Sequence, residues 1–262
     1  MKTIYYEDEL NDEFSEAIIE PRRIDENYPY EHKNPLWKLS TFLVQNVISL
    51  PIKLIYVKLK FRIKYVGREK LKPYKKQGYF VYGNHTQPFA DTFIITNTVF
   101  PKRNYLIVNP ENVSMKGLGN FVQQFGAIPI PNVRSGMKNF LQAIKSKIEK
   151  GYSITIFPEA HIWPYYTKIR PFKNVSFRYP IEMKTPTFCV TNTYQKRRNG
   201  KVKITTYVDG PFFPDEDLNN IQDKKQSLRD KVYKAMVERS KQNDFEYIKY
   251  IKKTSEEVKI KV

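Results

Sequence analysis

Residues 79–93 read YFVYGNHTQPFADTF, and this stretch decides how the rest of the chain is interpreted. The run from Tyr79 to Tyr82 consists of aromatic and β-branched residues, which is typical of a buried strand. Gly83 ends the run, so His85 lies at the carboxyl end of a strand. Sheets in α/β proteins usually place their active sites at that edge. The stretch therefore predicts both a strand and a candidate functional residue.

Similar apolar runs recur along the chain and alternate with helical patterns. Residues 136–150 carry apolar side chains at helical spacing and end at Gly151, while residues 215–246 form a charged helix with one apolar stripe. Strands that alternate with helices predict a layered α/β sheet. The other predicted strands are 61–67, 105–108, 154–157, 187–191 and 202–208.

The charge of the chain is large and unevenly distributed. The 262 residues have a formal net charge of +18, yet residues 1–34 hold ten acidic and four basic residues. The remaining chain therefore carries +24. This balance indicates an anionic partner, which could be nucleic acid, acidic lipid or a phosphorylated small molecule.

Cysteine usage excludes several kinds of site. Cys189 is the only cysteine, so no intramolecular disulfide and no zinc site built from cysteine pairs can form, and we predict no metal site. Cys189 lies in an apolar strand, where cysteine behaves as a small hydrophobic residue. The N-terminus lacks a basic region followed by an apolar stretch, so we expect a protein that faces the cytosol.

The first 60 residues differ from the rest. We interpret 1–34 as an acidic arm that lies on the body or is partly disordered. Residues 35–60 are apolar, but polar residues interrupt them and Pro51 breaks them, so no run reaches the roughly 20 residues of a spanning helix. Two short helices joined at Pro51 would suit a pair lying in the membrane interface, whereas a helical hairpin packed on the core fits equally well. We assign 61–247 to the main domain and 248–262 to a solvated basic tail.

His85 and Asp91 are the first candidate catalytic pair. A neutral imidazole can take a proton from a hydroxyl near pH 7 when a carboxylate on its other nitrogen fixes the tautomer and stabilises the imidazolium. Asp91 follows six positions later and could serve if the chain folds back. The same spacing also occurs in loops where a histidine and an aspartate are only a structural polar pair.

Two further segments add charged residues at strand ends. Phe157-Pro158-Glu159 ends another apolar strand, and Arg134 precedes the helix predicted at 136–150, where it could bind a phosphate together with helix-terminal amides. His161 could line the same pocket as Glu159 or fill space beside Trp163. His32, in the arm, is expected to be exposed.

In the order of these motifs the chain resembles the glycerophospholipid acyltransferases of the lysophosphatidic acid acyltransferase (1-acylglycerol-3-phosphate acyltransferase) type, over about residues 60–210. The resemblance implies a mixed, largely parallel central sheet flanked by helices, preceded by an interfacial helical pair. It departs from the family at three places: five residues rather than four separate His85 from Asp91, Asn132 stands where an arginine is usual, and the arginine after the Phe-Pro-Glu motif is missing. The matching motifs are Asn84-His85 with Asp91, Gly126-Ala127-Ile128-Pro129 with Arg134, Phe157-Pro158-Glu159, and Pro171-Phe172-Lys173.

The resemblance also implies a reaction. A fatty acyl group would move from acyl-coenzyme A or acyl carrier protein, as co-substrate, to a hydroxyl of a lysolipid acceptor, without a cofactor, a metal or a covalent acyl-enzyme. His85 would be the general base and Asp91 would orient it, with backbone amides near His85 or Arg134 stabilising the oxyanion. The residues expected to bind the acceptor are Asn84, Arg134, Glu159, His161 and, in place of the missing arginine, Lys168, Arg170 or Lys173.

The basic body and the apolar segment 35–60 together favour peripheral attachment to the cytoplasmic side of a membrane with anionic lipids. Two other functions fit the sequence. The first is a relative that kept the fold and binds lipid without turnover. The second is a basic nucleic-acid-binding protein rich in aromatic residues, although no nucleic-acid motif stands out and we expect no nucleic acid partner.

Overall fold

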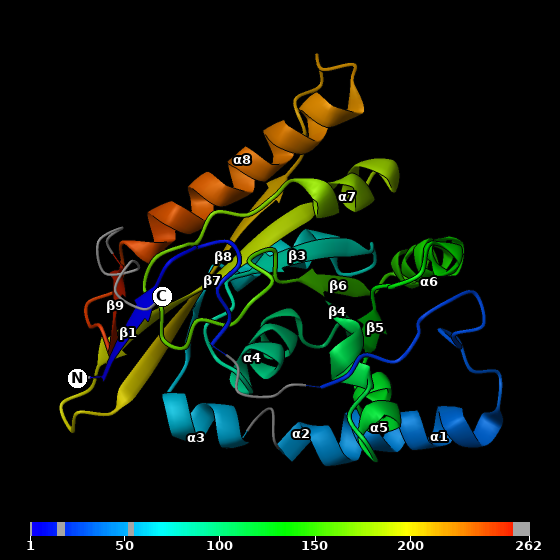
Figure 1. The fold of residues 1–262 in the computed structure, drawn as a ribbon, viewed down its shortest axis with the longest axis horizontal. Coiled ribbons are helices and arrows are strands. Elements are labelled where there is room, and N and C mark those ends of the chain that lie inside the picture. Colours follow the sequence, from blue (N-terminus) through cyan, green and yellow to red (C-terminus); the bar gives the residue numbers. More distant parts are fainter. Residues whose placement is uncertain (1, 15–18, 52–54, 254–262) are drawn as a thin grey trace, which may run out of the picture.

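A seven-stranded sheet forms the centre of the molecule (Figure 1), whose computed structural model describes residues 2–14, 19–51 and 55–253. In spatial order the strands are β2 (Lys64–Val66), β8 (Val202–Phe212), β7 (Thr187–Lys196), β3 (Tyr79–Gly83), β6 (Ser153–Ile156), β4 (Asn104–Val108) and β5 (Ala127–Pro129). Every neighbouring pair of strands in this sheet is parallel except β7 and β8, which are antiparallel. The predicted α/β fold with a mixed, mostly parallel sheet is therefore confirmed.

Helices cover both faces of this sheet (Figure 1). Successive side chains of a strand point to opposite faces, so on β3 Phe80 and Tyr82 pack in one cluster and Tyr79 and Val81 in another. The first cluster includes residues of α6 (Met137–Glu149) and α8 (Ile221–Ser240), and the second includes residues of α4 (Ala90–Val99). Burial on both faces fixes the position of the end of β3. Shorter helices are η3 (Arg68–Tyr74), η4 (Pro110–Val113), α5 (Gly119–Gln124), η5 (Arg134–Gly136), η6 (Val175–Phe177) and α7 (Arg178–Glu182).

The register of three parallel strands determines which residues meet beyond the sheet. Tyr82 of β3 pairs with Ile156 of β6, and Gly83 pairs with Val190 of β7. Three positions past the first pair come His85 and Glu159. Because parallel strands leave the sheet at the same edge, these two residues emerge next to each other.

The N-terminal helices lie along one side of the molecule. Helix α1 (Pro35–Leu43) begins at Asn34, whose side chain accepts from the Leu36 N–H, and continues through a π-helical turn, η1 (Val44–Ile48), into α2 (Ser49–Pro51). Helix α3 (Val57–Phe61) packs on the core through Val57 and Phe61, whereas α1 has no buried residue. The segment is thus packed on the core at α3 and exposed along α1. None of the helices in the described ranges combines the length and apolarity needed to cross a bilayer.

The two ends of the described chain form a small sheet of their own. Strand β1 (Lys2–Tyr6) pairs in parallel with β9 (Ile248–Lys252), and Lys2 lies opposite Ile248. The chain at β9 is therefore not the solvated tail that we expected from residue 248, because its backbone is paired; residues 254–262 lie outside the described ranges. The acidic arm lies on the body, where the Ile24 N–H donates to Asn132 Oδ1 over 2.8 Å.

Candidate active site

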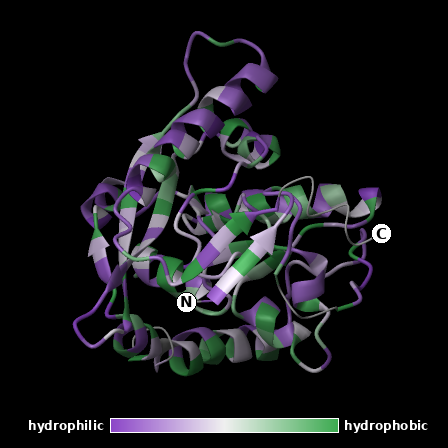
Figure 2. Cartoon of the chain, turned by 60° about the vertical axis from the view of Figure 1, so that its left-hand side comes forward, coloured by the Kyte–Doolittle hydropathy of each residue, from purple (hydrophilic) through white to green (hydrophobic). Residues whose placement is uncertain are grey.

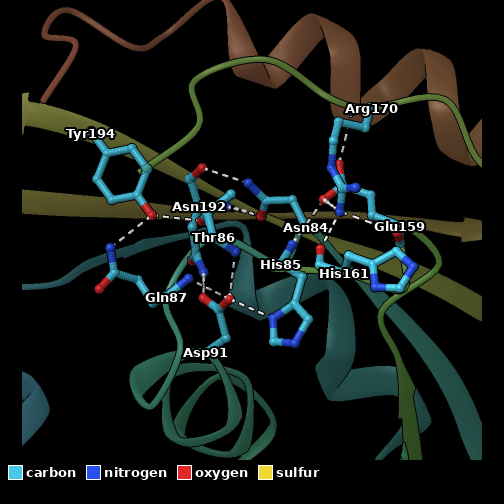
Figure 3. Close-up of polar contacts among 10 residues, drawn as sticks. All are labelled: Asn84, His85, Thr86, Gln87, Asp91, Glu159, His161, Arg170, Asn192 and Tyr194. Atoms are coloured by element: carbon cyan, nitrogen blue, oxygen red, sulfur yellow. Dashed lines mark hydrogen bonds and ion pairs between the residues drawn. The ribbon is translucent and has the colours of Figure 1, made fainter. Parts of the chain in front are cut away.

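His85 and Asp91 are in direct contact. His85 Nδ1 lies 3.0 Å from Asp91 Oδ2 (Figure 3), although five residues separate them in the sequence. Asp91 stands in the first turn of α4, which returns the chain towards the end of β3. The His85 side chain is 17% exposed and that of Asp91 only 1%. A buried carboxylate thus supports a histidine that solvent can reach.

Three further donors hold the Asp91 carboxylate. The backbone N–H groups of Thr86 and Gln87 donate to Oδ2 over 2.7 and 2.8 Å, and Asn192 Nδ2 donates to Oδ1 over 3.0 Å. The loop between His85 and Asp91 therefore wraps around the carboxylate, and its extra residue does not prevent the contact. These hydrogen bonds also offset the free-energy cost of burying the carboxylate.

The His85 ring has a fixed orientation. It stacks on Phe157, with ring centroids 4.2 Å apart and planes 13° apart. A carboxylate only accepts hydrogen bonds, so Nδ1 carries the proton that faces Asp91 in the neutral ring. The lone pair then resides on Nε2, which faces away from Asp91. This tautomer can accept a proton from a substrate hydroxyl.

Asn84 and Asn192 tie β3 to β7 behind the catalytic pair. Asn84 Nδ2 donates to the Asn192 carbonyl over 3.0 Å, and the Asn192 N–H donates to Asn84 Oδ1 over 2.8 Å. Thr206 Oγ1 donates to Asn192 Oδ1 over 2.8 Å. Asn84 is buried, and its side chain bonds to the backbone of β7. This contact differs from the contact with the acceptor that we expected for it. Asn192 was not predicted from the sequence, because nothing distinguishes it within its strand.

A buried tyrosine holds the loop from β7. The Tyr194 hydroxyl lies 2.6 Å from Thr86 Oγ1 and 3.1 Å from Gln87 Nε2, which donates to it. Burial raises the pKa of Tyr194 well above its usual value, so its hydroxyl stays neutral. Cys189, on the same strand, is also buried, and burial raises the pKa of its thiol. A thiol held protonated in this way is a poor nucleophile.

Glu159 holds the backbone of the site. Its Oε2 accepts from the His85 N–H over 3.1 Å, and its Oε1 accepts from the Arg170 N–H over 3.0 Å. Burial raises the pKa of Glu159, an effect that the Arg170 guanidinium and these two N–H groups oppose. Glu159 thus fixes the main chain at His85 rather than facing a substrate.

Arg170 occupies a buried position beside Glu159. Its Nη2 lies 3.8 Å from Glu159 Oε2, and its guanidinium donates to the carbonyls of Glu159, His161 and Glu9. The residue is only 1% exposed, and burial lowers the pKa of its guanidinium. These contacts differ from the acceptor-binding role expected for Arg170, because its two Nη groups already donate to protein carbonyls.

The acidic arm covers this part of the site. Trp163 Nε1 donates to the Asp12 carbonyl over 2.8 Å, and His161 Nδ1 lies 3.2 Å from Glu13 Oε2. The arm therefore binds through its main chain as well as through its acidic side chains. His161 contacts the arm, so it lies near Glu159 but faces another part of the protein.

The other predicted cations make no direct polar contact with the catalytic pair. Arg134 follows β5 in the chain. Strand β5 is three strands from β3, which corresponds to about 14 Å between these two strands. Arg134, Lys168 and Lys173 are all exposed. No hydrogen bond or ion pair among the described residues joins them to His85 or Asp91. In the same ranges, no group of three or more His, Cys, Asp or Glu side chains is placed to hold a metal ion.

Comparison with models of protein families gives a match. The model of the family described as Acyltransferase matches residues 62–193, which include the His85–Asp91 pair, Glu159 and Asn192. No curated protein is similar enough to match. The matched region covers half of the chain and includes the residues that form hydrogen bonds with Asp91. The chain therefore belongs to the acyltransferase family.

Proposed function

We propose that the protein transfers a fatty acyl group from an acyl thioester to a hydroxyl group of a lysophospholipid-like acceptor. The donor would be acyl-coenzyme A or the acylated form of acyl carrier protein. The observation that supports this most directly is the 3.0 Å contact between His85 Nδ1 and Asp91 Oδ2, which leaves Nε2 for a substrate. The family provides the reaction class, and the pair provides a general base.

The proposed mechanism uses His85 as both base and acid. Nε2 takes the proton of the acceptor hydroxyl while the hydroxyl oxygen attacks the thioester carbonyl carbon. Asp91 stabilises the imidazolium that forms. The tetrahedral intermediate then breaks its carbon–sulfur bond, and His85 gives the proton to the departing thiolate. The products are the acyl ester and the free thiol.

The oxyanion of the tetrahedral intermediate needs hydrogen-bond donors. Backbone amides near His85 or near Arg134 were the expected donors, but those of His85, Thr86 and Gln87 already donate to Glu159 and Asp91. Pro88 has no N–H to contribute. We therefore place the donors outside this part of the loop.

An acyl-transfer assay tests the proposal. Purified protein would be incubated with liposomes, a labelled acyl donor of each type and a panel of lysolipids and other hydroxyl acceptors, with products identified by mass spectrometry. Formation of an acyl ester supports the proposal and identifies both substrates. Binding of lysolipid without any product would instead indicate the lipid-binding relative that lost turnover.

The Asp91→Asn variant is expected to slow acyl transfer by about 10²–10⁴-fold, because an amide neither stabilises the imidazolium nor selects the tautomer with its lone pair on Nε2. The NH₂ group of the new asparagine would also face another hydrogen-bond donor, either Asn192 Nδ2 or the loop amides, so one hydrogen bond would be lost. Initial rates at saturating substrate measure the effect. Wild-type rates in this variant would show that the pair is only structural.

We further propose that the protein binds a membrane peripherally, with its helical side against the bilayer. Side chains of α1, η1 and α3 form an exposed apolar surface, and Figure 2 shows hydrophobic colouring on these helices along the lower edge. Large surfaces of this kind mark interaction sites. Members include Leu36 (74% exposed), Leu39, Phe42, Leu43, Val47, Ile48, Ile55 and Leu59 (71% exposed).

This apolar surface reaches the entrance of the catalytic pair. Phe89 lies in the loop between His85 and Asp91 and is 58% exposed, and its ring is 5.7 Å from that of Tyr56, next to α3. Lysines on α3, Lys58 and Lys60, are exposed beside it and would attract anionic lipid. A lipid acceptor could therefore pass from the bilayer to His85 without crossing water.

The double variant Leu39→Ser/Leu59→Ser is expected to reduce binding to lipid vesicles by about 10-fold or more, because each half-exposed leucine contributes roughly 1 kcal/mol when buried in lipid. Vesicle flotation at physiological salt measures this binding. Val175→Ser is the control, because Val175 is 64% exposed but belongs to η6, outside the helical surface. Equal loss in the control, or no loss in the double variant, would rule out this binding surface.

A further inference from the structure

A second pocket lies at the other end of α4 from the catalytic pair. It has a volume of about 670 Å³ and is lined by residues of α1, the end of α4, the start of β4 and α6. Asp91 opens α4, whereas Thr96 and Phe100, at its far end, border this pocket. Nine residues of helix separate Asp91 from Phe100, which corresponds to about 14 Å. The pocket is therefore separate from the proposed acyl-transfer site.

The wall of this pocket is strongly basic. Among its lining residues six are lysine or arginine, and Glu31 is the one carboxylate. Glu31 is already paired: its Oε1 lies 2.9 Å from Lys147 Nζ and 3.4 Å from Lys150 Nζ, and hydrogen bonds from Lys147 and Ser146 lower its pKa to about 2. One carboxylate cannot balance so many cations. The six are Lys33, Lys38, Lys102, Arg103, Lys147 and Lys150.

Two of these cations lie against the same aromatic ring. The Arg103 guanidinium carbon is 4.8 Å from the centroid of Tyr105, and Lys147 Nζ is 5.3 Å from it. Arg103 also lies over Tyr152, at 5.6 Å. Cations that share one ring repel each other, and the proximity of Arg103 is one of the effects that lower the pKa of Lys147, after burial. An anion between them would remove this repulsion.

A buried donor group of Arg103 has no partner. Its Nε is buried without a hydrogen bond to any described residue. An unpaired buried donor costs free energy of about 1–3 kcal/mol. A bound acceptor would satisfy it.

We propose that this pocket binds the phosphate group of a ligand. The Arg103 guanidinium presents paired N–H groups that match phosphate oxygens, and Lys147, over the same tyrosine ring, adds an ammonium group beside it. Trp37, Phe42 and Phe100 line the same pocket and offer apolar surface to the rest of the ligand. The volume is in the range of small-molecule sites and exceeds that of a bare ion. Because Trp37 and Phe42 belong to the helical region next to the apolar surface, the phosphate can be part of a lipid headgroup or of a soluble compound.

Binding measurements on the full chain test this site. The probes are sn-glycerol 3-phosphate, by calorimetry, and phosphatidylcholine vesicles with and without phosphatidic acid, by flotation at physiological salt. Arg103→Gln/Lys147→Gln is expected to weaken phosphate-dependent binding by at least about 10-fold, since each charge-assisted hydrogen bond contributes about one order of magnitude or more. Arg103→Lys keeps the charge and loses the paired geometry, so it should also weaken binding.

The matched control is Lys138→Gln/Lys145→Gln, which removes the same charge from exposed positions of α6. Binding of both probes, with loss only in the pocket variants, supports a site open to soluble phosphates; binding of phosphatidic acid vesicles alone, with the same selective loss, supports a lipid headgroup. Equal loss in the control pair, or no phosphate-dependent binding by the wild type, overturns the proposal. Neither readout involves acyl transfer, so the result is independent of the proposed enzyme activity.

Discussion

Replacing His85 by alanine is expected to lower the rate of acyl transfer by about 10²–10⁴-fold, because the variant lacks the group that takes the proton from the acceptor hydroxyl. His85 is the one histidine whose ring contacts Asp91, and Nε2 is left for a substrate. The rate would be measured with the donor and acceptor identified by the product assay, at saturating concentrations of both. The effect should fall on turnover more than on the KM of either substrate.

A second substitution separates chemistry from structure. In His85→Gln the side-chain amide can still donate to Asp91 but cannot take a proton, so this variant should be as inactive as His85→Ala. The other three donors to Asp91 come from Thr86, Gln87 and Asn192 and remain in both variants. The melting temperature of both variants should therefore stay close to that of the wild type. Full activity in a folded His85→Ala protein would refute the proposed mechanism.

Replacing Arg170 by leucine is expected to reduce the free energy of unfolding by about 3–5 kcal/mol, because removal of one partner leaves a buried charge without compensation. Glu159 would keep its two backbone donors but lose the guanidinium, and the carbonyls of His161 and Glu9 would lose a donor. For a chain of this size the melting temperature should fall by roughly 10 °C. Urea unfolding measures the free energy directly.

Loss of Arg170 should also loosen the acidic arm, because Arg170 donates to the Glu9 carbonyl. Limited proteolysis should then cut residues 1–14 faster than in the wild type. Arg178→Leu is the control: Arg178 pairs with Glu182 on an exposed helical turn, and such pairs contribute less than about 0.5 kcal/mol. Unchanged stability in Arg170→Leu would mean that the buried pair does not hold the site together.

Local sequence patterns predicted most of the central sheet. Strands β3, β4, β6, β7 and β8 each begin within one residue of the predicted position, because buried strands need continuous apolar runs. The predicted strand at 61–67 is shorter, since Phe61 ends α3 and Arg62 adopts a left-handed conformation. Strand β5 has only three residues and ends in proline, so it gives no recognisable run.

Other elements depend on contacts that are distant in the sequence. Helix α4 is buried on most sides, and apolar residues that surround a helix leave no period to detect. Strands β1 and β9 pair across almost the whole chain, and neither would be stable without the other. The acidic arm docks partly by backbone carbonyls, which the composition of its side chains cannot reveal.

The motifs predicted the catalytic pair but not its surroundings. His85 and Asp91 are close in sequence, and a single predicted strand, β3, is enough to place His85 at the carboxyl end of a strand. Asn192 and Tyr194 reach the same loop from β7, more than 100 residues away, and no local pattern links them to it. Arg170 was expected to bind the acceptor in place of the arginine missing after the Phe-Pro-Glu motif; it is buried instead, and one of its contacts comes from the distant arm.

The stacking of His85 on Phe157 limits how a proton can travel. The neighbouring ring and the carboxylate hold the imidazole in one orientation, with Nδ1 against Asp91. The same nitrogen, Nε2, must then take the proton from the alcohol and return a proton to the sulfur. Because the proposed mechanism forms no acyl-enzyme, both reactants have to be bound together, which predicts a ternary complex and a sequential kinetic order rather than a ping-pong cycle.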